Sequence, residues 1–339
     1  QDGPVVLVLV PSRELVLQIS AELGKYTKAL NVRICVAYGG QDGGSGDKRT
    51  QAAEVMKGVD ILVASPGRLI EFLEAGICRL SRVTYMVIDD ADEMLDMGFA
   101  PQVNAIATQT RPDCQTLMFS ATWSTDVQGL AKTYLTDPIK VVVNRAEESM
   151  ANKNVQHTVM IMQSLEEKNA KLVELLTQLK AEGRDQTRTF VFANTKQFVD
   201  EVVKTLKAKW PNVYGIHGGK TQQDREYSLS QFRSDPHAVL VATDVASRGL
   251  DIKGLPCVIN FQLPLEIDRL VQRIGRTGRA GMKGVAYSFF SERDAPMAAK
   301  LQKCVERAGQ SVPSDLTYYA KTAKSAKKQA KAKGEDWAL

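Results

Sequence analysis

With 339 residues, the chain is long enough for two domains, since one hydrophobic core rarely grows beyond roughly 250–300 residues. Hydrophobic residues make up 44% of the sequence and charged residues 24%, the proportions of a soluble globular protein. The net charge is +5, but residues 320–339 hold +4 of it, so the body carries only about +1. A uniformly basic body is therefore excluded. A nucleic-acid surface there would need locally placed arginines and backbone amides.

The sequence shows no feature of a membrane or secreted protein. No apolar run approaches the roughly 18 residues of a membrane span, and no signal peptide is visible. The five cysteines are odd in number, widely scattered and form no CxxC pair. Such cysteines are typical of reduced thiols, so we expect a protein of the cytoplasm or nucleus.

Apolar runs typical of strands alternate with segments of helical spacing such as Glu14–Ala29. The strand-like runs of the first half are Val5–Val10, Arg33–Tyr38, Asp60–Ser65, Thr84–Asp89, Thr116–Ala121 and Lys140–Val143. The apolar pattern vanishes around residues 144–154 and then restarts. The strand-like runs of the second half are His157–Met162, Arg188–Ala193, Val213–His217, Ala238–Thr243, Cys257–Phe261 and Gly284–Phe290.

This alternation predicts an α/β protein with two parallel sheets, each covered by helices on both faces. We expect a first domain over residues 1–144, a linker over 145–154 and a second domain over 155–316. A Lys-rich, solvated tail would follow over 317–339. Because the first residue is Gln1 and Val5 already belongs to a strand, we expect the chain to begin inside an incomplete first domain.

The stretch Tyr85–Phe99 runs from four apolar or aromatic residues straight into Asp89, Asp90 and Asp92. Acidic residues at the carboxyl end of a buried parallel strand lie where open α/β sheets bind their ligands. In nucleotide-hydrolysing folds such carboxylates hold Mg²⁺ and orient the attacking water. An acidic first turn that stabilises a helix dipole is the structural alternative.

The second half carries a cluster of arginines in the stretch Gln272–Gly281. Arg273, Arg276 and Arg279 are three residues apart, which predicts guanidinium groups along one side of a short helix, suited to bidentate contacts with phosphate. Before it, the stretch Val239–Asp251 begins as a strand-like run that ends in Thr243 and Asp244, and Arg248 and Asp251 follow. The structural alternative for each of these two stretches, taken by itself, is a cluster of surface ion pairs.

Taken together, these stretches resemble the motifs of the DEAD-box ATP-dependent RNA helicases, from the first residues to about Leu316. The matching stretches of the first half are Pro11–Leu15, Gly39–Gly40, Ser65–Arg68, Asp89–Asp92 and Ser120–Thr122. Those of the second half are Val191–Thr195, Gln222 with Arg225, Thr243–Asp251 and Gln272–Arg279. Each motif is weak by itself, but their occurrence in this order is specific.

The resemblance implies two tandem RecA-like domains that close on ATP and single-stranded RNA, in a monomeric protein. As catalytic residues, Asp89 would hold Mg²⁺ through water and Asp90 would position the hydrolytic water. Arg276 and Arg279 would reach the γ-phosphate, a contact worth roughly 10³–10⁵ in rate in related phosphoryl transfers. The residues implied to bind ATP are Asp92, Asp251, Arg276 and Arg279.

The resemblance also implies a coupling role for Ser120 and Thr122, which would link the nucleotide to domain closure. Residues from both domains would line the RNA. They are Pro11, Ser12, Arg13, Glu14, Gly39, Gly40, Pro66, Gly67, Arg68, Gln222, Arg225, Thr243, Arg248, Gly249, Gln272 and Arg273. Backbone amides and arginines bind phosphate without reading bases, so we expect binding that is independent of RNA sequence.

Three departures from the family pattern bear on activity. The chain starts after the place where the family has its phosphate loop, so we expect these 339 residues alone to hydrolyse ATP negligibly. Asp90 stands where the family has Glu, and a displacement of about 1 Å can reduce a positioned reaction by about 10²-fold. Gln272 stands where the family usually has His.

Two glycine-rich stretches imitate a phosphate loop. Gly218–Thr221 reads GGKT, but the full pattern requires glycine at position 214, which is Tyr214, so we expect a loop leading into the next helix. In Gly43–Lys48, Asp47 would repel phosphate, and we expect a flexible loop.

Two functions therefore remain open at this stage. The first is an ATP-dependent RNA helicase, and the second is a non-catalytic RNA-binding relative in which Asp90 and the phosphate loop are genuine losses. Only the resemblance disfavours a helicase that acts on DNA.

Deleting residues 320–339 tests whether the six lysines of the tail bind phosphate. Each phosphate neutralised on a single strand contributes about 0.7 to the log–log salt slope, so the deletion should flatten the salt dependence of RNA binding. It should weaken binding similarly for all sequences, whereas Arg68→Ala should weaken binding with or without the tail. The measurement is a titration of RNA binding against salt, and superimposable slopes would mean that the tail is not an RNA anchor.

Overall fold

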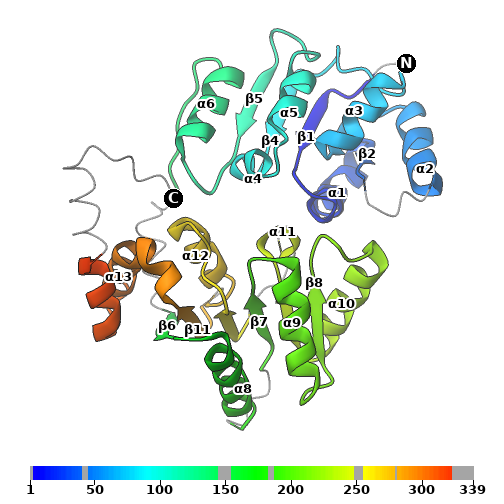
Figure 1. The fold of residues 1–339 in the computed structure, drawn as a ribbon. Coiled ribbons are helices and arrows are strands. Elements are labelled where there is room, and N and C mark those ends of the chain that lie inside the picture. The colour runs from blue at the N-terminus through cyan, green and yellow to red at the C-terminus, as the bar shows by residue number, and fades with distance from the viewer. Residues whose placement is uncertain are drawn as a thin grey trace. The chain divides into compact units, whose positions relative to one another are not determined.

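The computed structural model describes residues 3–39, 45–143, 154–181, 187–247, 255–278 and 281–322. The chain divides into two compact units, one with the described residues up to Val141 and the other with those from Val142 onwards (Figure 1). In these described ranges no helix is both long and apolar enough to cross a membrane.

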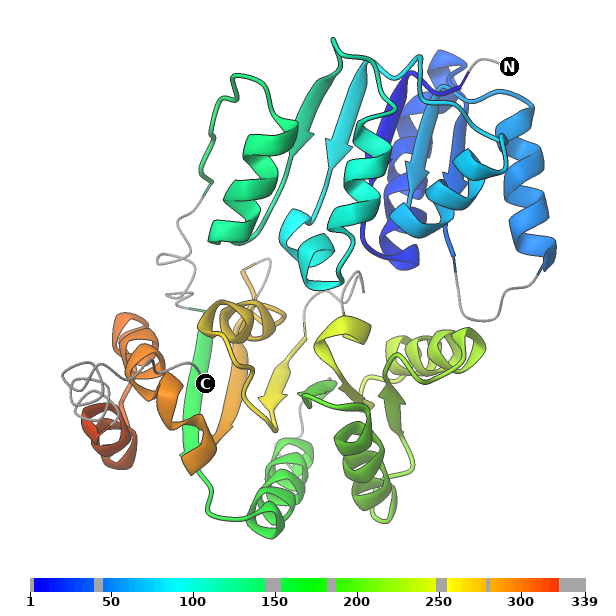
Figure 2. The same ribbon diagram turned by 45° about the horizontal axis from the view of Figure 1, so that its top comes forward.

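The first unit is built on one parallel sheet in the order β2-β3-β1-β4-β5 (Figure 2). Its strands are β1 (Val6–Leu9), β2 (Ile34–Ala37), β3 (Ile61–Ala64), β4 (Tyr85–Ile88) and β5 (Gln115–Met118). Its helices are α1 (Arg13–Thr27), η1 (Lys28–Leu30), α2 (Ser45–Met56), α3 (Pro66–Glu74), α4 (Ala91–Asp96), α5 (Ala100–Ala107) and α6 (Thr125–Tyr134).

Both faces of the central strand β1 are buried, which explains its continuous apolar run. Successive residues of a strand point to opposite faces. Leu7 and Leu9 accordingly belong to one hydrophobic cluster with α3 and α5, whereas Val8 and Val10 belong to another with α1. A strand buried on both faces is typical of a parallel sheet in an α/β protein, and the predicted fold of this half is confirmed.

The strand predicted over Lys140–Val143 is wrong. These residues form no strand, and Val141 and Val143 are 77% and 80% exposed. A run of β-branched residues becomes a strand only when another strand supplies hydrogen bonds, and no described strand pairs with this run. Lys140 instead lies over the ring of Trp123, with its Nζ 4.4 Å from the ring centroid.

The second unit is built on a parallel sheet in the order β6-β11-β10-β7-β9-β8, so the fold predicted for this half is confirmed as well. Its strands are β6 (Val155–Ile161), β7 (Thr189–Phe192), β8 (Val213–Ile216), β9 (Val239–Ala242), β10 (Cys257–Asn260) and β11 (Gly284–Phe290). Its helices are α8 (Leu165–Ala181), α9 (Lys196–Lys207), α10 (Gln222–Ser234), α11 (Asp244–Ser247), α12 (Ile267–Ile274), η2 (Glu292–Met297) and α13 (Ala298–Arg307).

The second unit continues past residue 316, where the sequence predicted its end. Residues 314–322 are helical, and Leu316 and Ala320 are buried in a hydrophobic cluster with Phe290 and Leu301. The first residues of the predicted tail therefore pack against the second unit. The rest of the Lys-rich tail, from residue 323, lies outside the described residues.

A chain of polar side chains crosses the interior of the second unit at β6. His157 is buried, and its Nε2 lies 2.8 Å from Ser288 Oγ, which also accepts a hydrogen bond from Asn260 Nδ2 over 3.0 Å. Burial lowers the pKa of His157 from 6.5 to about 4. Between about pH 4 and 6.5, the folded unit therefore keeps this imidazole neutral, whereas the unfolded chain would protonate it.

We expect the second unit to lose stability as the pH falls from about 6.5 towards 4. The folded pKa of His157 lies below its unfolded value, so its contribution is complete above pH 6.5 and decreases by about 3 kcal/mol near pH 4. His157→Gln keeps a hydrogen-bonding group and should remove this part of the pH dependence. Urea unfolding at several pH values measures it, and parallel stability curves for the two proteins would contradict the assignment.

Candidate functional site

The first unit carries an acidic turn at the carboxyl end of β4. Asp89 directly follows the strand, and Asp90 adopts a left-handed backbone conformation with φ 52° and ψ 52°. Aspartate enters this conformation more readily than most residues because its short side chain can hydrogen-bond locally. The N–H of Asp90 donates to Asp89 Oδ1, and the N–H of Ala91 donates to the carbonyl of Phe119, each over 3.0 Å. The acidic turn is thereby tied to the end of β5.

The carboxyl group of Asp89 is held in conditions that favour a bound cation. Burial raises its pKa, the N–H of Asp90 opposes this shift, and the charge of Asp92 adds to it. A nearby positive charge would offset the cost of keeping the carboxylate ionised. Mg²⁺ usually retains several waters and binds one or two carboxylates, so the site fits this ion. In the described part of the chain, no three His, Cys, Asp or Glu residues could together hold a metal ion.

Asp92 joins the acidic turn to the loop that follows β5. Its Oδ2 accepts hydrogen bonds from the backbone N–H of Thr122 over 3.0 Å and from Thr122 Oγ1 over 2.9 Å. Ser120 Oγ donates to the carbonyl of Thr122 over 2.8 Å. Two separated sequence motifs therefore form one hydrogen-bonded unit. A movement of Asp92 would be transmitted to the loop.

A second group of predicted site residues lies at the carboxyl ends of β1, β2 and β3. Ser12 caps α1 by accepting the N–H of Leu15 over 3.3 Å, and the Arg13 guanidinium lies 5.0 Å from the centre of the Tyr38 ring. Pro66 and Gly67 open α3, and Gly39 follows β2.

Arg68 is only 8% exposed, so it contacts mainly its own unit. Its Nη1 donates to Gln51 Oε1 over 3.4 Å, and its Nε lies 3.3 Å from the carboxylate of Glu71. A hydrogen bond from Lys48 lowers the pKa of Glu71, and the charge of Arg68 lowers it further. Arg68 is therefore positioned to hold the side chains of Gln51 and Glu71.

Gln51 is a residue of this region that the sequence did not reveal. It is buried, and its Oε1 also accepts the backbone N–H of Tyr38 over 2.9 Å. One amide thus joins the segment before Gly39 to Arg68 on α3. No sequence pattern marks a single glutamine on a helix, and only the folded contacts identify it.

In the second unit, Arg273 is 2% exposed and forms the centre of a buried network. Its Nε and Nη2 donate to the two carboxylate oxygens of Asp244 over 2.6 and 2.5 Å. Its Nη1 donates to the carbonyl of Gln262 over 2.7 Å, and Nη2 donates to Asn194 Oδ1 over 2.9 Å. The guanidinium carbon also lies 4.9 Å from the centre of the Phe192 ring. This arginine joins four segments of the unit.

The prediction that three arginines line one side of a short helix is wrong. α12 ends at Ile274, and Gly275 forms its C-terminal cap. Arg276 therefore lies beyond the helix, where it is partly buried, while Gln272 on the helix is exposed. Arg279 lies outside the described residues.

The GGKT stretch after β8 makes internal contacts that a phosphate loop would not make. The N–H of Gly219 donates to His217 Nδ1 over 3.1 Å, and Lys220 Nζ lies 3.0 Å from the carboxylate of Asp200. Thr221 caps α10 by accepting the N–H of Asp224 over 3.1 Å. These contacts support the interpretation of this stretch as a loop that leads into α10.

α10 then presents two further predicted site residues. Arg225 Nη1 donates to Gln222 Oε1 over 3.2 Å, so the two side chains lie together at the start of the helix. Thr243 is buried at the end of β9, and its N–H donates to the carbonyl of Ile216 over 3.3 Å. The predicted site residues outside the described part are Gly40, Arg248, Gly249, Asp251 and Arg279.

We expect Arg273→Ala to destabilise the second unit by about 3–5 kcal/mol, because it removes the buried guanidinium that pairs with Asp244 and donates to Gln262 and Asn194. Arg233→Ala, which removes an exposed arginine of the same unit, is the matched control and should change stability by less than about 0.5 kcal/mol. Denaturant unfolding measures both. Equal stability of the two variants would show that the network contributes little.

Two protein-family models match the chain. They describe a DEAD/DEAH box helicase over residues 1–130 and a helicase conserved C-terminal domain over residues 167–281. The chain is 46% identical to the probable ATP-dependent RNA helicase ddx17 of Dictyostelium discoideum, over 93% of this chain and 39% of that protein. It is 44% identical to the ATP-dependent RNA helicase DBP2 of Saccharomyces cerevisiae, over 94% of this chain and 57% of that protein. The chain spans about half the length of these relatives.

Solved structures show the same fold. S. cerevisiae Dbp5 bound to RNA and ADP BeF3 aligns with 96% of this chain and 81% of its own, with a TM-score of 0.75 and 26% identity. The DEAD-box helicase Mss116 bound to ssRNA and UDP-BeF aligns with 95% of this chain and 67% of its own, with a TM-score of 0.77 and 26% identity. The two sheets are therefore tandem RecA-like units.

Proposed function

Because the chain belongs to the DEAD-box helicase family, we propose that it couples ATP binding and hydrolysis to the separation of RNA strands. The observation that carries this proposal is the hydrogen-bonded unit of Asp92, Thr122 and Ser120. It joins the acidic turn, where a nucleotide-bound Mg²⁺ fits, to the loop after β5. A change in the position of the turn would therefore move this loop.

We assign the following roles at the nucleotide. Asp89, which is half buried with a raised pKa, would hold Mg²⁺ through water, and Asp90 would orient the attacking water. When bound, the Mg²⁺ ion supplies charge that stabilises the phosphate oxygens of ATP. Arg276, Arg279 and Asp251 are proposed contacts to ATP on the strength of their motifs.

We further propose that RNA is bound through its sugar–phosphate backbone. The likeness to Dbp5 and Mss116, both solved with RNA, supports this assignment. Arg13, Gln222 and Arg225 would contact phosphate, while Arg68 and Arg273, which are largely buried, would position their neighbours. Such contacts carry no base information, so binding would be independent of sequence. We also propose that the protein acts as a monomer in the cytoplasm or nucleus.

One observation favours a second function, that of a non-catalytic RNA-binding relative. Asp90 has a carboxylate one methylene shorter than the family's glutamate, and its left-handed backbone favours the shorter residue. A carboxylate that is set back from the water would bind nucleotide without activating the reaction.

The two functions are distinguished by measuring RNA-stimulated phosphate release and displacement of a short RNA strand with the natural full-length protein. The helicase proposal expects both activities to depend on ATP and Mg²⁺, and Asp89→Asn should abolish them. Retained RNA binding with no phosphate release above a no-enzyme control would instead establish the binding function.

In the same protein we expect Asp90→Glu to raise kcat by up to about 10²-fold while changing ATP affinity little, since the carboxylate acts on water positioning. Asp90→Asn removes the charge at nearly constant size and should lower kcat. Steady-state kinetics with saturating RNA provide the measurement. Equal or lower turnover for Asp90→Glu would show that Asp90 is already well placed.

A further inference from the structure

The turn between β8 and α10 is held by a buried imidazole. His217 directly follows β8 and is only 5% exposed. The backbone N–H of Lys220 donates to the carbonyl of His217 over 3.0 Å, which closes a four-residue turn. Inside this turn, the N–H of Gly219 donates to His217 Nδ1 over 3.1 Å. The residue that begins the turn therefore binds the middle of the turn with its side chain.

This contact determines which ring nitrogen carries the proton. Because Nδ1 of His217 accepts a hydrogen bond, the proton of the neutral ring lies on Nε2. Nε2 lies 3.1 Å from Asp200 Oδ2, to which it donates. The other oxygen of this carboxylate, Oδ1, lies 3.0 Å from Lys220 Nζ. Asp200 belongs to α9, so one carboxylate of this helix holds both ends of the turn.

The turn also packs closely against α9. A Cβ on Gly219 would lie 3.1 Å from His217 Nδ1 and 3.5 Å from Lys196 Cδ, so its backbone lies against both side chains. Lys196 is the first residue of α9, and Asp200 follows one helical turn later. The position of the turn is therefore set by the imidazole and by two residues of α9.

α10 begins where this turn ends. Thr221 is the N-cap of the helix and accepts the N–H of Asp224 over 3.1 Å. The start of the helix carries Gln222 and Arg225, and Arg225 Nη1 donates to Gln222 Oε1 over 3.2 Å. Because Thr221 directly follows the turn, a displacement of the turn would displace the start of α10 and both of these side chains.

We propose that His217 and Asp200 are positioning residues for RNA, which hold the turn so that α10 presents Gln222 and Arg225 to the RNA backbone. This inference rests on the proposed RNA contacts of Gln222 and Arg225. The Asp200 side chain is 53% exposed, and exposed ion pairs contribute little to stability. Its contacts therefore fix the orientation of the turn more than they stabilise the unit.

Two substitutions of His217 separate its two hydrogen bonds. Asparagine places an oxygen near the position of Nδ1 and can still accept the N–H of Gly219, whereas glutamine places a nitrogen near Nε2 and can still donate to Asp200. We expect His217→Gln to weaken RNA binding about five- to tenfold and His217→Asn by less than about twofold. The measurement is fluorescence anisotropy of a short labelled oligouridine with the natural full-length protein and a non-hydrolysable ATP analogue.

A protein without the two proposed RNA contacts distinguishes positioning from general destabilisation. Gln222→Ala/Arg225→Ala should by itself weaken binding at least about tenfold. Adding His217→Gln to it should weaken binding by less than about a further twofold, because the turn then has no contact left to position. Asp200→Ala leaves the buried ring in place and should weaken binding by more than about threefold.

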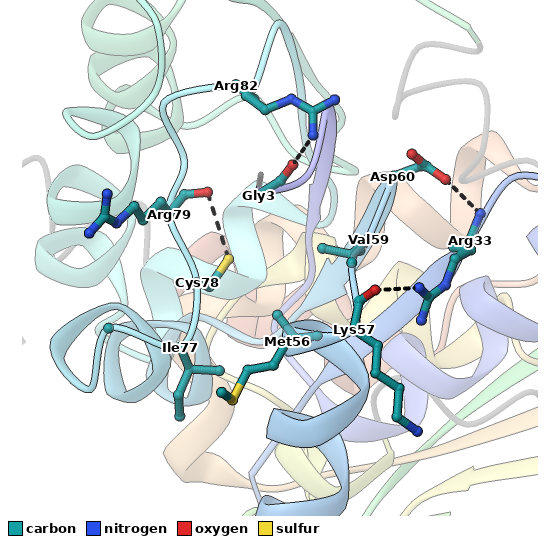
Figure 3. Close-up of a pocket in the computed structure, with 13 residues that line it drawn as sticks. Gly3, Arg33, Met56, Lys57, Val59, Asp60, Ile77, Cys78, Arg79 and Arg82 are labelled. Atoms are coloured by element: carbon teal, nitrogen blue, oxygen red, sulfur yellow. Dashed lines mark hydrogen bonds between the residues drawn. The ribbon is translucent and has the colours of Figure 1, made fainter. Parts of the chain in front are cut away.

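Two control variants remove similar groups away from the turn. His237→Gln removes an exposed imidazole that precedes β9, at the opposite edge of the second sheet. Asp60→Ala removes a carboxylate at the amino edge of the first sheet, where it accepts the N–H of Arg33 over 2.8 Å (Figure 3). Both variants should bind RNA with unchanged affinity. Circular dichroism establishes that all variants are folded.

Losses in His217→Gln and Asp200→Ala that His217→Asn and the controls do not share would support the proposal. Three results would overturn it alone: native affinity of His217→Gln, equal losses for the Gln and Asn variants, or an undiminished effect of His217→Gln in the protein without Gln222 and Arg225. Native affinity of Gln222→Ala/Arg225→Ala would overturn the proposed RNA contacts of α10 together with this inference.

Discussion

The first unit depends on one carboxylate that holds two strand ends together. Asp92 lies in the first turn of the helix after β4, yet it accepts two hydrogen bonds from Thr122, after β5. Adjacent parallel strands end at the same edge, so a residue just past one strand can reach the loop past the next. The N–H of Ala91 likewise donates a hydrogen bond to the carbonyl of Phe119, which also follows β5. Asp89 and Asp90 are therefore presented by a turn whose geometry is set by the neighbouring strand.

Arg273 performs the equivalent task in the second unit with opposite charge. It lies on α12 and bonds residues that follow β7, β9 and β10, which are neighbours in the sheet. Arg273 is nearly excluded from water in its pair with Asp244, and a buried charge without its partner costs several kcal/mol. Arg68 and Gln51 form a smaller version in the first unit. In both units, residues of the predicted motifs thus also determine the local fold, so we expect their substitution to change stability.

The sequence predicted those features that follow from local pattern. Continuous apolar runs such as Tyr85–Ile88 predicted strands of the parallel sheet, and the carboxylates after this run lie at its carboxyl end. The pattern failed where the outcome depends on a partner. Lys140–Val143 has strand composition but pairs with no described strand. The arginine spacing suggested one helical face, but Gly275 ends α12 after Arg273. Gln51 carried no signal, because its importance arises from two contacts distant in sequence.

The left-handed backbone of Asp90 gives a structural reason for an aspartate that is independent of catalysis. This conformation costs roughly 1–2 kcal/mol for most residues, and a short polar side chain reduces that cost. A longer carboxylate would reach further towards a water above the strand end, but it would forgo part of this local compensation. Selection for a stable turn therefore favours Asp at this position, whereas selection for a carboxylate that reaches the water favours Glu. The same turn also holds Asp89, whose pKa is raised by burial. Binding of a cation would stabilise the ionised form of this carboxylate.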